Sequence, residues 1–164
     1  MYLLGLSVIY CAAYLMLFFG ISFFFTNHLP KLNLDSLKSV TFILLFYFGV
    51  LVMSSLISDP EWSNRTLHTF GGGFLIVLVT FFAIKDSGTK INVFQFIIIG
   101  ISIAALFGIA NEIFEFILQN YFGFIFADSI NDTWLDLISN SIGSILASVF
   151  IVPFKKSLKT VSTP

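Results

Sequence analysis

The chain has 164 residues, of which 57% are hydrophobic and 10% are charged, and its mean hydropathy is +0.98. Soluble globular proteins carry roughly a quarter charged residues, so this composition excludes a water-soluble particle and indicates an integral membrane protein. The single cysteine, Cys11, excludes an internal disulfide and a cysteine-rich metal site. The formal net charge is only −1, so the distribution of charges is more informative than their sum.

Five long apolar stretches predict five transmembrane helices, because the hydrocarbon core of a bilayer needs about 20 apolar residues of helix. The first stretch, residues 1–25, lacks the basic start and the small-residue cleavage site of a signal peptide, so we expect it to remain as a span. In chain order, the predicted spans are residues 2–25, 38–58, 66–84, 91–119 and 133–154. The intervals between them are short and polar. The expected fold is therefore an all-α bundle that forms one transmembrane domain over residues 1–164.

Basic residues predict the orientation of this bundle. Cytoplasmic loops of membrane proteins carry an excess of Lys and Arg, and five spans place the first loop, the third loop and the C-terminal tail on one side. Seven of the eight basic residues fall in these regions: Lys31, Lys38, Lys85, Lys90, Lys155, Lys156 and Lys159. We therefore expect the N-terminus outside and the C-terminus in the cytoplasm, with Arg65 as the one basic residue on the outer side.

The acidic residues show the opposite bias, which topology rules do not require because acids contribute little to orientation. Seven of the nine fall on the expected outer side: Asp59, Glu61, Glu112, Glu115, Asp128, Asp132 and Asp136. We interpret Asp59, Glu61 and Asp128 as ordinary loop acids. The other four lie at the outer ends of the fourth and fifth spans and need another explanation.

Helical spacing gathers these polar groups on three faces. On the fifth span, residues four apart share one face, and Asp132, Asp136 and Asn140 are followed there by Gly143, Ser144 and Ala147. On the fourth span, the same spacing aligns Gly100, Ala104, Gly108 and Glu112, with Glu115 beside them, and on the third it aligns Arg65, His68 and Gly72. Small residues let helices pack closely in lipid. The glycine run 71–73 indicates either such close packing or a flexible hinge. We expect the three faces to meet in an acidic pocket that opens outward, while the first two spans mainly shield it from lipid.

Ionisable groups inside a membrane are costly and usually mark function. With one arginine among several carboxylates, some carboxylates must be protonated, hydrated or neutralised by a cation. The candidate catalytic residues are His68, Glu112 and Asp136, which could also share a divalent cation, and the candidate substrate-binding residues are Arg65, Glu115, Asp132 and Asn140. Structural roles remain open beside these: Arg65 could be an interfacial anchor, Asp132 a helix cap, and Asp136 with Asn140 a link between helices.

Three motifs resemble those of VanZ-like membrane proteins, and more closely those of an uncharacterised bacterial inner-membrane family typified by YjdF. They are Arg65-x-x-His68, Glu112-x-x-Glu115 and Asp136-Leu-Ile-Ser-Asn140-Ser-Ile-Gly143. The resemblance covers residues 64–147, but Asn64 and Glu115 stand where these families often have Asp and Gln. It implies a multi-pass protein of a bacterial or archaeal cell membrane.

Three classes of function fit this pattern. The first is a membrane-embedded enzyme or binding protein for an envelope or lipid-linked substrate. The second is a small ion-coupled transporter. We expect no matching polar groups in the inner halves of the spans, and their absence would argue against this class. The third is a non-catalytic scaffold or accessory subunit. The bilayer is the expected partner in each case, and the chain has no basic patch with interleaved aromatic residues that would bind nucleic acid.

Overall fold

A computed structural model describes residues 2–124 and 130–155, and within this part every regular element is a helix. Five helices are long and apolar enough to cross a membrane, which confirms the predicted fold class. Four of them are α1 (Tyr2–Thr26), α2 (Leu34–Ser55), α5 (Val93–Phe122) and α6 (Ile130–Ile151). The third consists of α3 (Pro60–Thr66), η1 (Leu67–Phe74) and α4 (Leu75–Asp86), which follow one another without a break. A short helix, η2 (Val152–Lys155), follows α6.

The third span starts six residues before the predicted position 66, because the sequence contains a helix start there. The Asp59 side chain accepts hydrogen bonds from the backbone N–H groups of Glu61 and Trp62, at 2.9 and 3.1 Å. Pro60 follows in the first helical turn, where its missing N–H costs nothing. Asp59, which we interpreted as a loop acid, is therefore the N-cap of the third span.

The other boundaries also shift by a few residues, at local signals. Asn33 and Asn92 form capping boxes with Ser36 and Gln95, so α2 starts at 34 rather than 38 and α5 at 93 rather than 91. Gly123 ends α5 in the left-handed conformation, with φ 74°. The last long helix covers 130–151 rather than 133–154, so Asp132 lies inside its first turn instead of capping it.

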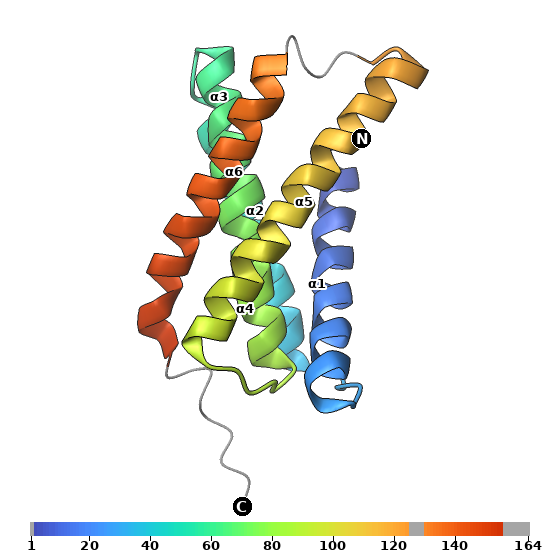
Figure 1. Ribbon diagram of the computed structural model, residues 1–164, viewed down its shortest axis with the longest axis vertical. Coiled ribbons are helices and arrows are strands. Elements are labelled where there is room, and N and C mark those ends of the chain that lie inside the picture. The colour runs from blue at the N-terminus through green and yellow to red at the C-terminus, as the bar shows by residue number, and fades with distance from the viewer. Residues whose placement is uncertain (1, 125–129, 156–164) are drawn as a thin grey trace, which may run out of the picture.

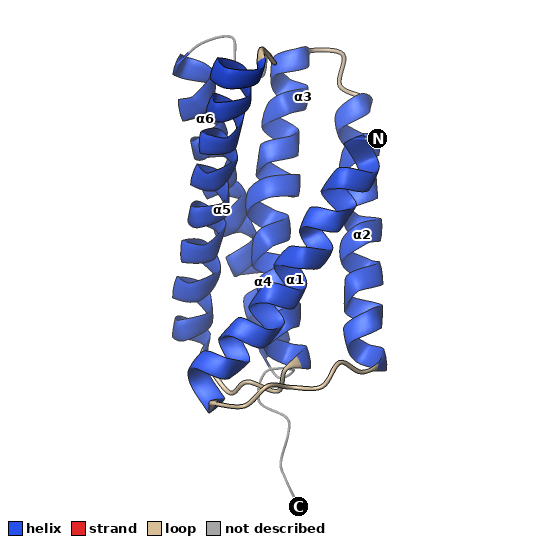
Figure 2. Ribbon diagram, turned by 90° about the vertical axis from the view of Figure 1, so that its right-hand side faces the viewer, coloured by secondary structure: helices blue, strands red, loops and turns tan. Residues whose placement is uncertain are grey.

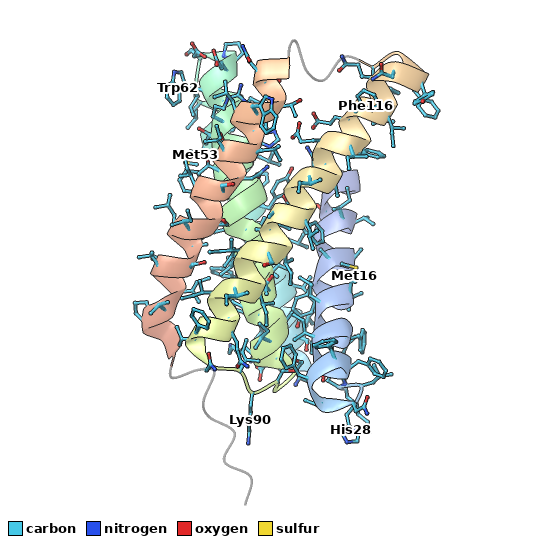
Figure 3. The ribbon with its side chains drawn as sticks, in the orientation of Figure 1. Met16, His28, Met53, Trp62, Lys90 and Phe116 are labelled. Atoms are coloured by element: carbon cyan, nitrogen blue, oxygen red, sulfur yellow. The ribbon has the colours of Figure 1, made fainter. Side chains whose placement is uncertain are left out.

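The third span is the centre of the bundle. Successive long helices run in opposite directions (Figures 1 and 2), and α4 contacts α1, α2, α5 and α6. Nine of the twelve α4 residues are buried, including Leu75, Val77 and Ala83. The outer helices instead expose many large apolar side chains, such as Met16 on α1 and Phe116 on α5 (Figure 3), as a lipid-facing surface requires.

The two ends of the bundle carry different charges. One end, here called the acidic end, holds Trp62, the start of α6 and the end of α5, whereas His28 and Lys90 lie at the other, here called the lysine end (Figure 3). The lysines whose side chains the structure describes all lie at the lysine end: Lys31, Lys38, Lys85 and Lys90. Lys156 and Lys159 lie outside the described residues. The predicted separation of lysines from acids is thus present in the described part of the fold.

Buried polar groups also occur toward the lysine end, contrary to our expectation for the inner halves of the spans. The Tyr14 hydroxyl, which is fully buried, donates a hydrogen bond of 2.7 Å to Asp86 Oδ2. Among the residues that the structure describes, the other carboxylate oxygen of Asp86 is buried and has no hydrogen-bond partner. This pair joins α1 to the end of the third span and could not be recognised from helical spacing, because it connects residues 72 positions apart.

Candidate functional site

The part of the third span that carries the site is a π-helix, η1, which occupies Leu67–Phe74 between two α-helical segments. π-Helical segments are rare in proteins, and those that do occur are often found at functional sites. The Tyr10 hydroxyl on α1 donates a hydrogen bond of 2.7 Å to the Gly71 carbonyl within η1. The π-helix, with His68 in its first turn, is therefore held against the first span.

The glycines of η1 and α6 allow these two segments to meet backbone to backbone. A Cβ atom on Gly73 would overlap the carbonyl oxygen of Asn140, and one on Gly143 would overlap the carbonyl oxygen of Thr69. The close-packing role expected for the glycine run is confirmed at this position. Because the backbones approach so closely, short polar side chains on the two segments can reach one another.

Arg65 connects the third span to α6 through two carboxylates. Its guanidinium donates to Asp136 Oδ1 through Nη1 and to Asp132 Oδ1 through Nη2. The Arg65 side chain is 12% exposed and that of Asp136 only 3%, so this ion pair is shielded from solvent. The Asn64 side chain donates a further hydrogen bond of 3.1 Å to Asp136 Oδ1. Arg65 therefore turns into the bundle rather than outward to the interface.

His68 lies between Asp136 and Asn140, both on α6. Its Nε2 is 3.3 Å from Asp136 Oδ2, and its Nδ1 is 3.4 Å from the Asn140 side-chain nitrogen. An amide N–H that donates to Nδ1 requires the proton on Nε2, which then donates to Asp136. The two neighbours thus select one tautomer of neutral His68 in this arrangement.

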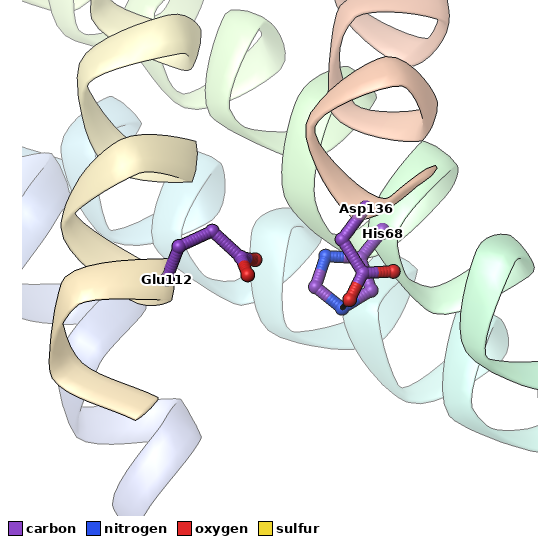
Figure 4. A group of neighbouring side chains, drawn as sticks. All are labelled: His68, Glu112 and Asp136. Carbon is purple, nitrogen blue, oxygen red and sulfur yellow. Dashed lines mark ion pairs between the residues drawn. The ribbon is translucent and has the colours of Figure 1, made fainter. Parts of the chain in front are cut away.

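Glu112 completes a group of three residues from three spans. Figure 4 shows its carboxylate reaching from α5 toward His68 and Asp136. One potential ligand atom from each residue lies within 4.8 Å of the other two. Glu112 Oε1 is buried and has no hydrogen-bond partner among the described residues. A buried carboxylate oxygen without a partner is costly, so this position calls for a proton or a cation.

The remaining predicted residues lie around this group. Asp132 and Asn140 contact Arg65 and His68, as described above, whereas Glu115 accepts a hydrogen bond of 2.8 Å from Asn111 on its own helix. Asp128, which we grouped with the outer acids, lies outside the described residues. The predicted meeting of the three polar faces is therefore present in the structure.

A cavity of about 270 Å³ adjoins this cluster. His68, Glu115, Asp136 and Asn140 contribute to its polar wall. Tyr10 and Ile9 from α1, with Tyr47 and Leu51 from α2, also line it. The first two spans therefore help to form the pocket, and our expectation that they mainly shield it was incomplete. The tyrosines gave one signal in the sequence, since each is a polar group within a long uncharged stretch.

Two glycines make room for the Asn140 side chain. A Cβ atom on Gly72 would overlap Asn140 Oδ1, and one on Gly108 would lie 3.2 Å from its nitrogen. The small residues of the third and fourth spans thus leave space at this position for the Asn140 amide beside His68.

The site is rich in carboxylates. It contains one permanent cation, Arg65, and four acids, which are Asp132, Asp136, Glu112 and Glu115. Arg65 binds both aspartates, and neither Glu112 nor Glu115 forms an ion pair with another described residue. The site therefore places the His68 imidazole in the cavity wall, with the Glu112 carboxylate close beside it.

Comparison with known proteins places the chain in a family but attaches no activity to it. The model of a family described as "Predicted membrane protein (DUF2238)" matches residues 5–157. No curated protein and no solved structure matches the chain. The family description supports a membrane protein, while the resemblance to VanZ-like proteins stays a prediction. Because the match covers more than half of its length, the chain belongs to the DUF2238 family of predicted membrane proteins.

Proposed function

We propose that this protein binds an envelope or lipid-linked substrate in the cavity at the acidic end of its bundle, and that this end faces outward from a bacterial or archaeal cell membrane. The observation that carries the proposal is the convergence of His68, Glu112 and Asp136 from three spans beside that cavity. A structural role would not need an uncompensated Glu112 oxygen there. The motif resemblance to VanZ-like proteins supports the same membrane.

The chemistry of the lining favours a substrate with both polar and apolar parts. His68 lines the cavity and can exchange a proton with a hydroxyl or amine group of a substrate, and the Glu112 carboxylate lies beside it. The apolar wall from Ile9, Leu51 and Phe107 suits the hydrocarbon portion of a lipid-linked molecule. Arg65, which we listed as a substrate-binding residue, is engaged by two carboxylates, so its role in this proposal is to position Asp136.

An ion-coupled transporter is the second candidate. The observation in its favour is Asp86 toward the lysine end, where Oδ2 accepts a hydrogen bond from the buried Tyr14 and the buried Oδ1 has no partner within the described part of the chain. Proton or solute flux in liposomes, lost in Glu112→Gln and in Asp86→Asn, would favour this candidate over a substrate-binding site with access from one side.

Envelope lipids of cells that lack the protein should differ from those of cells that contain it. We expect plasmid-borne wild type to restore the lipid profile and Glu112→Gln to fail, at equal abundance in the membrane. Asp35→Asn, which alters an exposed carboxylate at the lysine end, is the matched control and should restore the profile. The measurement is mass spectrometry of extracted lipids. A profile that is unaffected by loss of the protein, or full restoration by Glu112→Gln, would contradict the proposal.

The outward orientation has its own test. In a Cys11→Ser background, a membrane-impermeant maleimide should label Trp62→Cys in intact cells, because Trp62 is 69% exposed at the acidic end. Lys90→Cys, at the lysine end, should be labelled only after the membrane is permeabilised. The reverse pattern of labelling would show that the acidic end faces the cytoplasm.

A further inference from the structure

We infer that a divalent transition-metal ion of the Zn²⁺ class is bound beside the cavity at the acidic end, by His68 Nε2, one carboxylate oxygen of Glu112 and Asp136 Oδ2. This deepens the proposed function, on which it rests for the place where a substrate would meet the ion. Three observations carry it, namely the spacing of the ligand atoms, the state of Glu112 and the groups that hold the other two ligands.

The ligand atoms have nearly the spacing that a shared ion requires. Ligands at about 2.0–2.2 Å from a tetrahedral Zn²⁺ lie about 3–4 Å apart. His68 Nε2 and Asp136 Oδ2 are already 3.3 Å apart. All three ligand atoms lie within 4.8 Å of one another. A small rotation of the Glu112 side chain therefore brings the third ligand into range, while the other two stay in place.

Glu112 supplies the energetic reason for a cation. Its Oε1 atom is buried without a hydrogen-bond partner among the described residues, and the Glu112 carboxylate lies close to that of Asp136 on α6. The two terminal nitrogens of Arg65 are bound to Asp132 and Asp136, and its buried Nε has no hydrogen-bond partner among the described residues, so Arg65 does not pair with Glu112 in this arrangement. A divalent ion between Glu112, His68 and Asp136 would satisfy the free oxygen and offset the repulsion between the two carboxylates.

The groups behind the ligands are those of a metal site. Ligating carboxylates and histidines are usually held by outer hydrogen bonds that set their orientation. Arg65 and Asn64 donate to Asp136 Oδ1, and Asn64 also lies 3.4 Å from Oδ2, which is 3.3 Å from His68 Nε2. Asn140 lies at His68 Nδ1, and a half-turn of its amide would present an oxygen that accepts the Nδ1–H of a metal-bound imidazole.

The donor set selects the class of ion. Mg²⁺ and Ca²⁺ prefer sites made only of oxygen ligands, whereas one imidazole and two carboxylates suit Zn²⁺ and its first-row neighbours. Three protein ligands leave a coordination position open, as in catalytic zinc sites. The adjoining cavity of about 270 Å³ provides the space next to that position. An ion there would polarise an oxygen of a bound substrate.

The test measures Zn²⁺ binding to the full chain, purified in detergent with a tag that contains no histidine and stripped with a chelator. After addition of Zn²⁺ alone and removal of the excess, we expect elemental analysis to find one ion per chain in the wild type. His68→Ala and Glu112→Gln should each weaken binding at least about tenfold in calorimetry, which is the lower limit for disturbing even an outer ligand.

Matched controls separate this site from other binding. His28→Ala removes the only other histidine, which is exposed at the lysine end, and Glu61→Gln removes a glutamate that is exposed at the acidic end. Both should bind Zn²⁺ as the wild type does. Size-exclusion profiles must match for all variants, and Glu112→Gln keeps the shape of the side chain, so loss of the fold cannot imitate loss of the site.

Absence of bound Zn²⁺ in the wild type, or equal losses in His28→Ala and His68→Ala, would overturn the inference. If Zn²⁺ does not bind but Glu112→Gln still fails to restore envelope lipids, the metal site is wrong and the proposed function stands. If Zn²⁺ binds with the expected residue dependence but Glu112→Gln restores the lipids, the metal site stands and the proposed function is wrong.

Discussion

Asp136→Asn should destabilise the bundle by about 3 kcal/mol, because removal of one partner from a buried ion pair leaves an uncompensated charge. The affected charge is that of Arg65, whose side chain is 12% exposed and which also binds Asp132. Asp132 compensates part of the loss, so the expected value lies at the lower end of the range for buried pairs. The measurement is equilibrium unfolding in mixed micelles, by SDS titration followed with circular dichroism.

The control for this substitution is Asp35→Asn. Asp35 also pairs with a basic residue, Lys38, at 2.9 Å, but both side chains are about two thirds exposed. Exposed pairs contribute little to stability, so this variant should unfold like the wild type. If Asp136→Asn unfolds at the same SDS fraction as Asp35→Asn, the Arg65 cluster does not stabilise the acidic end.

A double substitution distinguishes the effect of losing the Arg65–Asp136 ion pair from the effect of leaving one buried charge uncompensated. Arg65→Met combined with Asp136→Leu removes both buried charges, and replacement of a buried pair by apolar side chains is often neutral or stabilising. We therefore expect the double variant to be more stable than Asp136→Asn. It should nevertheless lose Zn²⁺ binding, since Asp136 is a proposed ligand.

Gly143→Ala should destabilise the bundle by about 3 kcal/mol, the upper part of the range for overpacked positions. The added methyl group would overlap the Thr69 carbonyl oxygen and crowd the Phe74 backbone nitrogen. Both are main-chain atoms within the third span, so no side-chain rotation can relieve the clash. Helix α6 must then move away from η1, which also separates His68 from Asp136 and Asn140.

Gly49→Ala provides the comparison, because a Cβ atom there meets nothing within 4 Å. Its free energy of unfolding should match or slightly exceed that of the wild type, since alanine favours helix over glycine. The same SDS titration compares the two variants. Equal stability of Gly143→Ala and Gly49→Ala would mean that α6 and η1 do not approach as closely as described.

Much of the fold and of the candidate site follows from local rules that a sequence displays directly. Apolar runs of bilayer length identify five spans, and the spacing of four residues on the fifth places Asp132, Asp136 and Asn140 on one face. The same periodicity aligns Gly100, Ala104 and Gly108 below Glu112, and all three small residues are buried in the bundle. These features depend only on the pitch of a helix and the thickness of a membrane.

Which faces meet, and which partner each charge takes, was decided only by the tertiary structure. Arg65 binds two aspartates and does not pair with Glu112, and Tyr10 and Tyr47 from the first two spans line the cavity. The pairing of Tyr14 with Asp86 joins segments 72 positions apart. The physical reason is that a helix presents its faces by local periodicity, whereas its rotation and tilt are set by close packing against its neighbours, here at Gly73 and Gly143.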